Sequence, residues 1–261
     1  MRTALSVVLA SSFLLACDGS GSLSDTETPT PTAPEEVELT TDDGLTISGT
    51  YQEAVGASRG PGLLLLHQFQ RDRHDFDVIW DELHAAGYSL LAIDFRSHGL
   101  SDDADVNIQE LLSDRDQLVW DVSAGLDFLD TKNLAVGNEL IGVVGLSVGG
   151  NMAIVANHNT HNGQAAAWKA DAIVTVSARK DRAEDLAGDN SLTLRNGLYV
   201  AGADESIQAE AAVELEGATL GDRESLLVEG SAAHGAELLA ESAVVRQRLA
   251  TWFSEVWSLS L

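Results

Sequence analysis

The sequence is poor in cysteine, because Cys17 is the only one in 261 residues. A lone thiol cannot form a disulfide within the chain or supply a zinc site built from several thiolates. A fold stapled by internal disulfides is therefore excluded. A chain of this length is instead long enough to bury one large apolar core, and it shows no internal repeat.

Basic residues are also scarce. The chain has 15 Lys and Arg against 41 Asp and Glu, a formal net charge of −26. Such a surface repels phosphates, so we expect no nucleic-acid partner. The acidic excess suits either general solubility or a salty medium in which ions screen the repulsion. It does not require a cation-binding function.

The apolar run at residues 4–16 is too short to span a bilayer comfortably. It follows Arg2 and ends in "LLAC", which resembles a bacterial lipoprotein signal. The resemblance implies removal of residues 1–16 and lipidation of Cys17, which would tether the protein to a membrane of the bacterial cell envelope, outside the cytoplasm. An ordinary secretory signal or a buried helix is the alternative.

The segment 17–36 continues from the cysteine with "DGSGSLSDTETPTPTAPEE". It is rich in Ser, Thr, Gly, Pro and acidic residues and has almost nothing to bury, which is typical of a flexible spacer. We therefore expect the folded domain to cover residues 37–261.

Strand-like and helix-like segments alternate through this domain. The Asp43-Gly44 pair between the first two strand-like runs indicates a hairpin. Strands are predicted at 37–41, 45–52, 62–67, 88–95, 139–146, 171–177, 197–203 and 225–230. Helices are predicted at 74–86, 107–130, after residue 147, at 206–215 and at 236–257. This order predicts an α/β fold with a mostly parallel sheet covered by helices on both faces, preceded by an antiparallel hairpin.

The pattern G-x-S-x-G occurs at residues 145–149, between a predicted strand and a predicted helix. The bare pattern arises easily by chance, but a strand before it and a helix after it are the context that the motif needs. A sharp turn there would expose the hydroxyl of Ser147 as a nucleophile. The N–H of Val148, at the helix N-terminus, would stabilise an oxyanion. A turn of small residues without chemistry is the alternative.

A serine nucleophile needs a base, and His234 follows the last predicted strand on a loop of small residues. His158 and His161 form an H-x-x-H pattern, but no third ligand is indicated, so a solvated loop explains it better than a metal. His67 and His98 end two earlier strands. Loop packing and hydrogen bonding near the site are the expected roles of these two.

The base in turn needs a carboxylate that holds its tautomer. Asp204 ends a predicted strand in "VAGADES" and is the first candidate, Glu205 the second and Asp181 the third. The order Ser147, Asp204, His234 puts each residue after a successive predicted strand, where the active sites of such sheets lie.

These segments together resemble the α/β-hydrolase fold over essentially all of residues 37–261. The matching stretches are "LLLLHQF", "AIDFRSHGLSD", "GLSVGG", "GADES" and "GSAAHGAELL". The last of these is most similar to small serine hydrolases related to dienelactone hydrolases. The resemblance implies that Ser147 is the nucleophile, Asp204 the acid and His234 the base. It also implies that the second oxyanion N–H comes from Phe69, with Gln68 as the alternative.

Three positions depart from the pattern of this group. Gln68 and Ser97 stand where glycines are usual. At Gln68 the consequence is either a tighter loop after the third strand or a side chain that enters the site. The dienelactone relatives typically carry a cysteine as nucleophile, whereas Ser147 is a serine.

The span 178–196 can hold a short helix but no large cap domain, and no apolar lid is visible in it. We therefore expect an open site that hydrolyses carboxylic esters of a small-molecule acyl substrate through an acyl-enzyme, with no metal and no organic cofactor. Amide, thioester or lactone cleavage is an alternative within the same chemistry. A catalytically silent binding lipoprotein is the alternative outside it.

Overall fold

The computed structural model describes residues 33–55, 61–134, 140–158, 160–162, 164, 165 and 169–259. The expected signal segment 1–16, Cys17 and the linker as far as residue 32 lie outside the described residues. The first strand begins at Glu35, two residues before the expected start of the folded domain.

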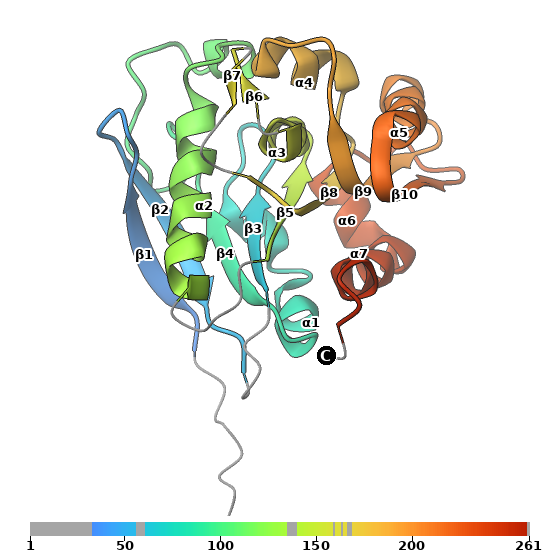
Figure 1. The fold of residues 1–261 in the computed structure, drawn as a ribbon, viewed down its shortest axis with the longest axis horizontal. Coiled ribbons are helices and arrows are strands. Elements are labelled where there is room, and N and C mark those ends of the chain that lie inside the picture. The colour runs from blue at the N-terminus through green and yellow to red at the C-terminus, as the bar shows by residue number, and fades with distance from the viewer. Residues whose placement is uncertain are drawn as a thin grey trace, which may run out of the picture.

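The centre of the domain is an eight-stranded sheet with the strand order β1-β2-β4-β3-β5-β8-β9-β10 (Figure 1). The strands are β1 (Glu35–Thr40), β2 (Thr46–Gln52), β3 (Gly62–Leu66), β4 (Ser89–Ile93), β5 (Ile141–Leu146), β8 (Ala172–Val176), β9 (Leu194–Gly202) and β10 (Thr219–Val228). β2 pairs antiparallel with both β1 and β4, and the other neighbours are parallel. The short strands β6 (Thr160–His161) and β7 (Gln164–Ala165) form a separate pair. The expected mostly parallel sheet with an N-terminal antiparallel hairpin is confirmed.

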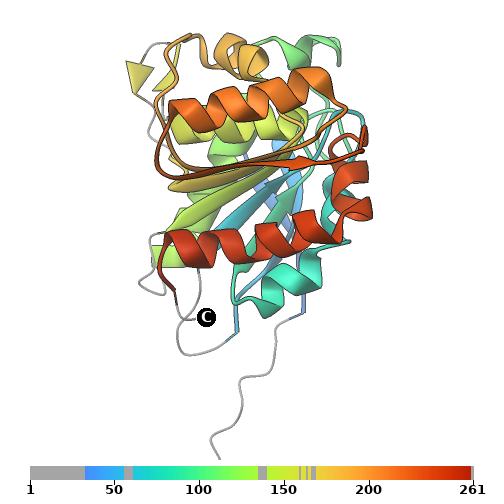
Figure 2. The same cartoon turned by 90° about the vertical axis from the view of Figure 1, so that its right-hand side faces the viewer.

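Helices cover both faces of this sheet (Figure 2). One face is covered by α2 (Leu118–Leu134), α3 (Val148–His158), α4 (Lys180–Ala187) and α5 (Ser206–Ala218). The other face is covered by α1 (Trp80–Ala85), α6 (Ala236–Glu241) and α7 (Ala243–Val256). A separate apolar core lies on each face of the sheet, and strand β3 contributes to both. Its Leu64 and Leu66 pack on the first face and Leu63 and Leu65 on the second. Burial on both faces explains why the central strands β3, β4, β5 and β8 are almost entirely apolar.

Three predicted helices are interrupted in the structure, the first two of them by 3-10 turns. The segment 107–130 contains a 3-10 turn, η2 (Glu110–Leu112), and α2 begins only at Leu118. Between them the carboxylate of Asp114 accepts from the N–H of Asp116 at 2.9 Å, a local bond that competes with helix formation. The predicted helix 74–86 likewise consists of the 3-10 turn η1 (Arg73–Phe76) followed by α1.

The predicted closing helix 236–257 is divided at Ser242 into α6 and α7. Ser242 is extended, with φ −102° and ψ 103°, and its hydroxyl accepts from the N–H of Val245 at 3.3 Å. A serine in this conformation ends one helix and caps the next. The division matters because α6 becomes a separate short element directly after the loop that carries His234.

The connection from β8 to β9 contains α4 and no larger insertion, so the expected absence of a large cap domain is confirmed. Within the described ranges, no helix is both long and apolar enough to cross a bilayer.

Candidate active site

Ser147 sits on the turn between β5 and α3 in a left-handed conformation, with φ +52°. Its N–H donates to the carbonyl of Val176 at 2.8 Å, and its own carbonyl accepts from Asn151 at 3.0 Å. A serine rarely adopts this backbone region, and the hydrogen bonds on both sides of the residue hold it there. The turn therefore has the geometry that exposes a nucleophile.

The glycines of the motif are required by close approach of the backbone. A Cβ atom on Gly145 would overlap the carbonyl of Gly149, and one on Gly149 would overlap the carbonyl of Leu66 at the end of β3. Both glycines thus let β3, β5 and α3 meet tightly around Ser147.

His234 lies within hydrogen-bond distance of the serine, although the two residues are far apart in sequence. Its Nε2 is 2.7 Å from Ser147 Oγ, and it is carried by the loop between β10 and α6. The His234 side chain is 40% exposed. The structure therefore brings together the expected nucleophile and the expected base at an open edge of the sheet.

The carboxylate that contacts His234 is that of Glu205 rather than Asp204, which corrects the expectation from the sequence. Glu205 Oε1 lies 2.6 Å from Nδ1 of His234, and its side chain is only 6% exposed. Asp204 is exposed, and its N–H donates to the carbonyl of Ser231. Asp181 forms a separate ion pair with Arg179 at 2.5 Å.

The difference between the two adjacent acids is one of position and length. Asp204 lies in the exposed turn after β9, whereas Glu205 immediately precedes α5 and its longer side chain turns inward to His234. Because a carboxylate only accepts, Nδ1 of His234 carries the hydrogen of this bond. Nε2 is then free to accept the hydroxyl proton of Ser147.

Both carboxylate oxygens of Glu205 are occupied. Oε2 accepts from Ser177 Oγ at 2.7 Å and from the N–H of Gly202 at 3.1 Å. Burial opposes ionisation, but hydrogen bonds from His234, Ser177 and Gly202 outweigh it and hold the pKa of Glu205 below its ordinary value. The group facing His234 is therefore a carboxylate at neutral pH.

Ser177 is a residue of this site that the sequence reasoning did not select. It directly follows β8, has φ +56°, and its hydroxyl also accepts from the N–H of Gly235 at 3.0 Å. A polar residue directly after a buried parallel strand was the available signal.

The two expected oxyanion donors come from different elements. Val148 opens α3, where its N–H has no acceptor within the helix. The N–H groups on either side of Phe69 are both bound: Gln68 donates to Asp75 Oδ2 at 3.2 Å, and Gln70 donates to His98 Nε2 at 3.1 Å.

His67 orients the peptide that carries the Phe69 N–H. The carbonyl of Gln68 accepts from His67 Nδ1 at 2.7 Å, and Nε2 of the same ring accepts from the N–H of Phe95 at 2.9 Å. In a planar trans peptide the N–H of Phe69 points away from this bonded carbonyl. Burial lowers the pKa of His67 to about 4, so the ring is neutral at pH 7.

His98 also has a structural role, as expected, because its Nδ1 bonds the carbonyl of Arg96 at 2.9 Å. The two histidines of the H-x-x-H pattern make separate hydrogen bonds. His158 Nδ1 accepts from Thr193, and His161 Nε2 bonds the carbonyl of Arg115. No group of three or more His, Cys, Asp or Glu side chains able to hold a metal occurs in the part of the chain that the structure describes.

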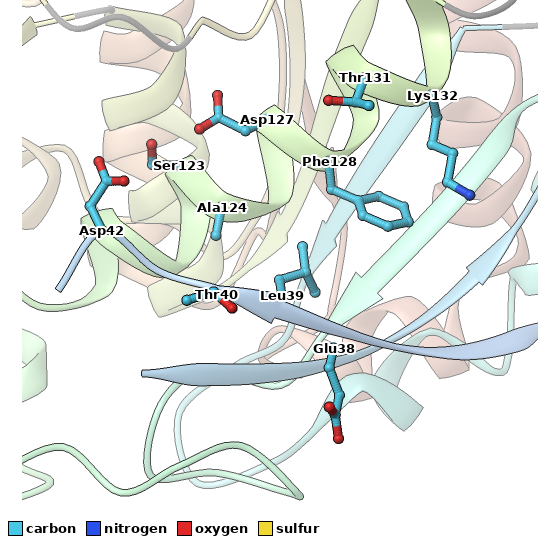
Figure 3. A pocket seen from close by; sticks show the side chains of 10 residues that line it. All are labelled: Glu38, Leu39, Thr40, Asp42, Ser123, Ala124, Asp127, Phe128, Thr131 and Lys132. Atoms are coloured by element: carbon cyan, nitrogen blue, oxygen red, sulfur yellow. The ribbon is translucent and has the colours of Figure 1, made fainter. Parts of the chain in front are cut away.

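A pocket of about 340 Å³ lies elsewhere, between β1 and α2 (Figure 3). Asp42, Ser123 and Asp127 lie at one end and Lys132 at the other. None of Ser147, Glu205 and His234 lines it. This pocket is therefore separate from the candidate site.

The strand order, the strained serine turn between β5 and α3, and the histidine after β10 define the α/β-hydrolase fold. No protein-family model matches the chain, and no characterised protein sequence matches it. Solved structures do. The esterase Pf2001 from Pyrococcus furiosus is 18% identical with a TM-score of 0.64, over 86% of this chain and 93% of that one. A dienelactone hydrolase from Anabaena variabilis is 18% identical with a TM-score of 0.63, over 87% of this chain and 98% of that one.

Proposed function

We propose that the protein is a serine hydrolase that cleaves carboxylic esters through an acyl-enzyme intermediate. The observation that carries this proposal is the continuous hydrogen-bonded series from Ser147 Oγ to His234 Nε2 and from His234 Nδ1 to Glu205 Oε1, at 2.7 and 2.6 Å. The likeness of this chain in fold to the esterase and the dienelactone hydrolase also supports hydrolysis as the proposed reaction.

In the first half-reaction Ser147 Oγ attacks the ester carbonyl while its proton passes to His234 Nε2. The carbonyl oxygen becomes an oxyanion, which accepts hydrogen bonds from the N–H groups of Val148 and Phe69. Glu205 stabilises the imidazolium through Nδ1. The intermediate then collapses, the bond to the alcohol oxygen breaks, and His234 gives its proton to the leaving alcohol.

In the second half-reaction water replaces the alcohol. His234 takes a proton from water as the oxygen attacks the acyl carbonyl, and the same two N–H groups stabilise the second oxyanion. Collapse releases the carboxylic acid and returns the proton to Ser147. The cycle needs no group beyond the side chains and peptide N–H groups of this chain.

The openness of the site favours small or exposed acyl groups. The ring of His234 is 40% exposed, and the only helix between β8 and β9 is the eight-residue α4. A screen of short- and long-chain esters, lactones, thioesters and aminoacyl amides tests the substrate class. Ester turnover below that of amides would replace the ester proposal with a peptidase one.

The decisive experiment combines a fluorophosphonate probe with turnover of p-nitrophenyl acetate. Wild-type protein should be labelled on Ser147, and Ser147→Ala should lose the label and nearly all turnover, by roughly 10⁴-fold or more. Ser191→Ala is a matched control, because Ser191 is exposed. Absence of the label on native wild-type protein would instead favour a catalytically silent binding protein.

We also propose that Cys17 carries a lipid that attaches the domain to a membrane of the bacterial cell envelope. The sequence pattern before this cysteine supports the proposal. Metabolic labelling with an alkyne fatty acid in a bacterial host should mark the wild-type protein and not Cys17→Ala. Equal labelling of both proteins would contradict it.

A further inference from the structure

The side chain of Gln68 connects the loop after β3 to the N-terminus of α6. Its Oε1 accepts from the N–H of Ala236 at 2.8 Å, and its Nε2 donates to Glu237 Oε2 at 3.3 Å. The two loops that it joins carry the Phe69 N–H and the ring of His234. These are the two groups whose relative position the proposed reaction depends on.

The backbone of Gln68 is fixed on its own side of this connection. Its N–H donates to Asp75 Oδ2 at 3.2 Å, and its carbonyl accepts from His67 at 2.7 Å and from the N–H of Arg71 at 3.3 Å. The Asp75 side chain is only 1% exposed and is also paired with Arg71. The side-chain amide of Gln68 therefore extends from a backbone that three hydrogen bonds hold in place.

On the other side the amide reaches the residues directly after His234. The two peptide N–H groups that follow this histidine are each held by a side chain: Gly235 by Ser177 Oγ at 3.0 Å and Ala236 by Gln68 Oε1. Gly235 has no side chain to cap α6, so Gln68 supplies the acceptor for the first turn of this helix from across the site.

The fit around Gly235 shows how closely the Gln68 amide lies against the catalytic loop. Gly235 has φ +53°, and a Cβ atom there would overlap Gln68 Oε1 and lie 3.7 Å from the Cβ of Ser147. Only glycine combines this backbone conformation with the space that the amide takes.

We propose that Gln68 is a positioning residue that locks the base-bearing loop to the oxyanion loop, so that His234 and the Phe69 N–H keep one relative geometry. The role rests on the proposed hydrolase function and adds a residue to it. Gln68 acts through Ala236 and not on the substrate, so its loss should reduce kcat much more than it changes KM for a small ester.

The direct test is Gln68→Met, which keeps the length of the side chain and removes both hydrogen bonds. We expect kcat for p-nitrophenyl acetate to fall about 10- to 100-fold, the scale of a misplaced catalytic group, with KM within about twofold. Gln247→Met is the matched control, because Gln247 is exposed on α7. An unchanged kcat in Gln68→Met would overturn the proposal.

An exchange of donor and acceptor separates positioning from a general loss of packing. Gln68→Glu keeps an acceptor for the N–H of Ala236. It also places a carboxylate opposite that of Glu237, and because the two repel each other, kcat should again fall. The double variant Gln68→Glu/Glu237→Gln restores one donor and one acceptor across the same gap, and we expect it to recover kcat to within about threefold of wild type. Failure of the double variant to exceed Gln68→Glu would contradict the role.

A measurement without substrate keeps this inference separate from the proposed function. The ring hydrogen on Nδ1 of His234, bonded to Glu205, should give a low-field proton resonance in the wild-type protein. Gln68→Met should broaden or lose this resonance through exchange with water, while Gln247→Met keeps it. A sharp resonance in Gln68→Met would overturn the inference even if no ester proves to be a substrate.

Discussion

Ser177 Oγ lies 2.7 Å from Glu205 Oε2, on the carboxylate oxygen that His234 does not use. The same hydroxyl accepts from the N–H of Gly235, the residue next to the histidine. One buried side chain thus holds both the acid and the loop of the base. The precision of the candidate site therefore depends on β8 as well as on the strands that carry its principal groups.

The first prediction separates the two adjacent acids. Glu205→Gln should lower kcat/KM for p-nitrophenyl acetate by about 10³- to 10⁴-fold, because an amide neither fixes the tautomer of His234 nor stabilises the imidazolium. Asp204→Asn is the matched control and should stay within about threefold of wild type, since Asp204 is exposed. The reverse ranking of the two variants would restore Asp204 as the acid.

The second prediction concerns the hydroxyl of Ser177. Ser177→Ala should lower kcat/KM about tenfold and reduce the free energy of unfolding by about 1–3 kcal/mol, because the buried N–H of Gly235 loses its acceptor. Steady-state kinetics and urea unfolding measure the two effects.

Ser177→Gly provides the control for backbone strain in that experiment. Ser177 has φ +56°, which glycine adopts without penalty. Glycine should therefore recover some stability but no activity, since the hydroxyl is still missing. Wild-type kcat/KM in Ser177→Gly would show that the hydroxyl has no part in positioning Glu205.

The third prediction is a loss of stability on acidification that comes from His67. The pKa of this buried ring is about 4 in the folded protein, against 6.5 for an ordinary histidine. Between these values the unfolded chain binds a proton that the folded protein does not. Stability from this group is therefore full above pH 6.5, and about 3 kcal/mol of it is lost as the pH falls to 4.

Urea unfolding at several pH values between 7.5 and 4 measures this dependence. His67→Gln should be less stable than wild type at pH 7.5, and its free energy of unfolding should fall less steeply toward pH 4. Parallel pH profiles for the two proteins would show that His67 does not contribute.

The fourth prediction follows from the formal net charge of −26. Repulsion among the carboxylates opposes the compact state, and salt screens it over about 10 Å at 0.1 M ionic strength. The midpoint of urea unfolding should rise between 0.05 and 1 M sodium chloride. Equal midpoints across this range would show that the acidic surface leaves stability unaffected at neutral pH.

The main features of the fold follow from local patterns in the sequence. Short apolar runs without alternation predict strands buried on both faces, and helical periodicity between them predicts the parallel connections. The places where local bonding overrides periodicity were not predictable from the apolar pattern. The Asp114 turn before α2 and the Ser242 break before α7 are such places.

The residues of the candidate site likewise fall into those that the sequence predicts and those that only the tertiary structure identifies. By itself the sequence determined Ser147 and His234, because a nucleophile between glycines and a histidine after the last strand must meet at one edge of a parallel sheet. Only the tertiary structure decided between Asp204 and Glu205, and only it directed the Gln68 side chain to Ala236. Strand order fixes which loops meet, whereas the depth and direction of a side chain depend on packing from distant segments. Neighbouring acids in one turn look alike until that packing buries one of them.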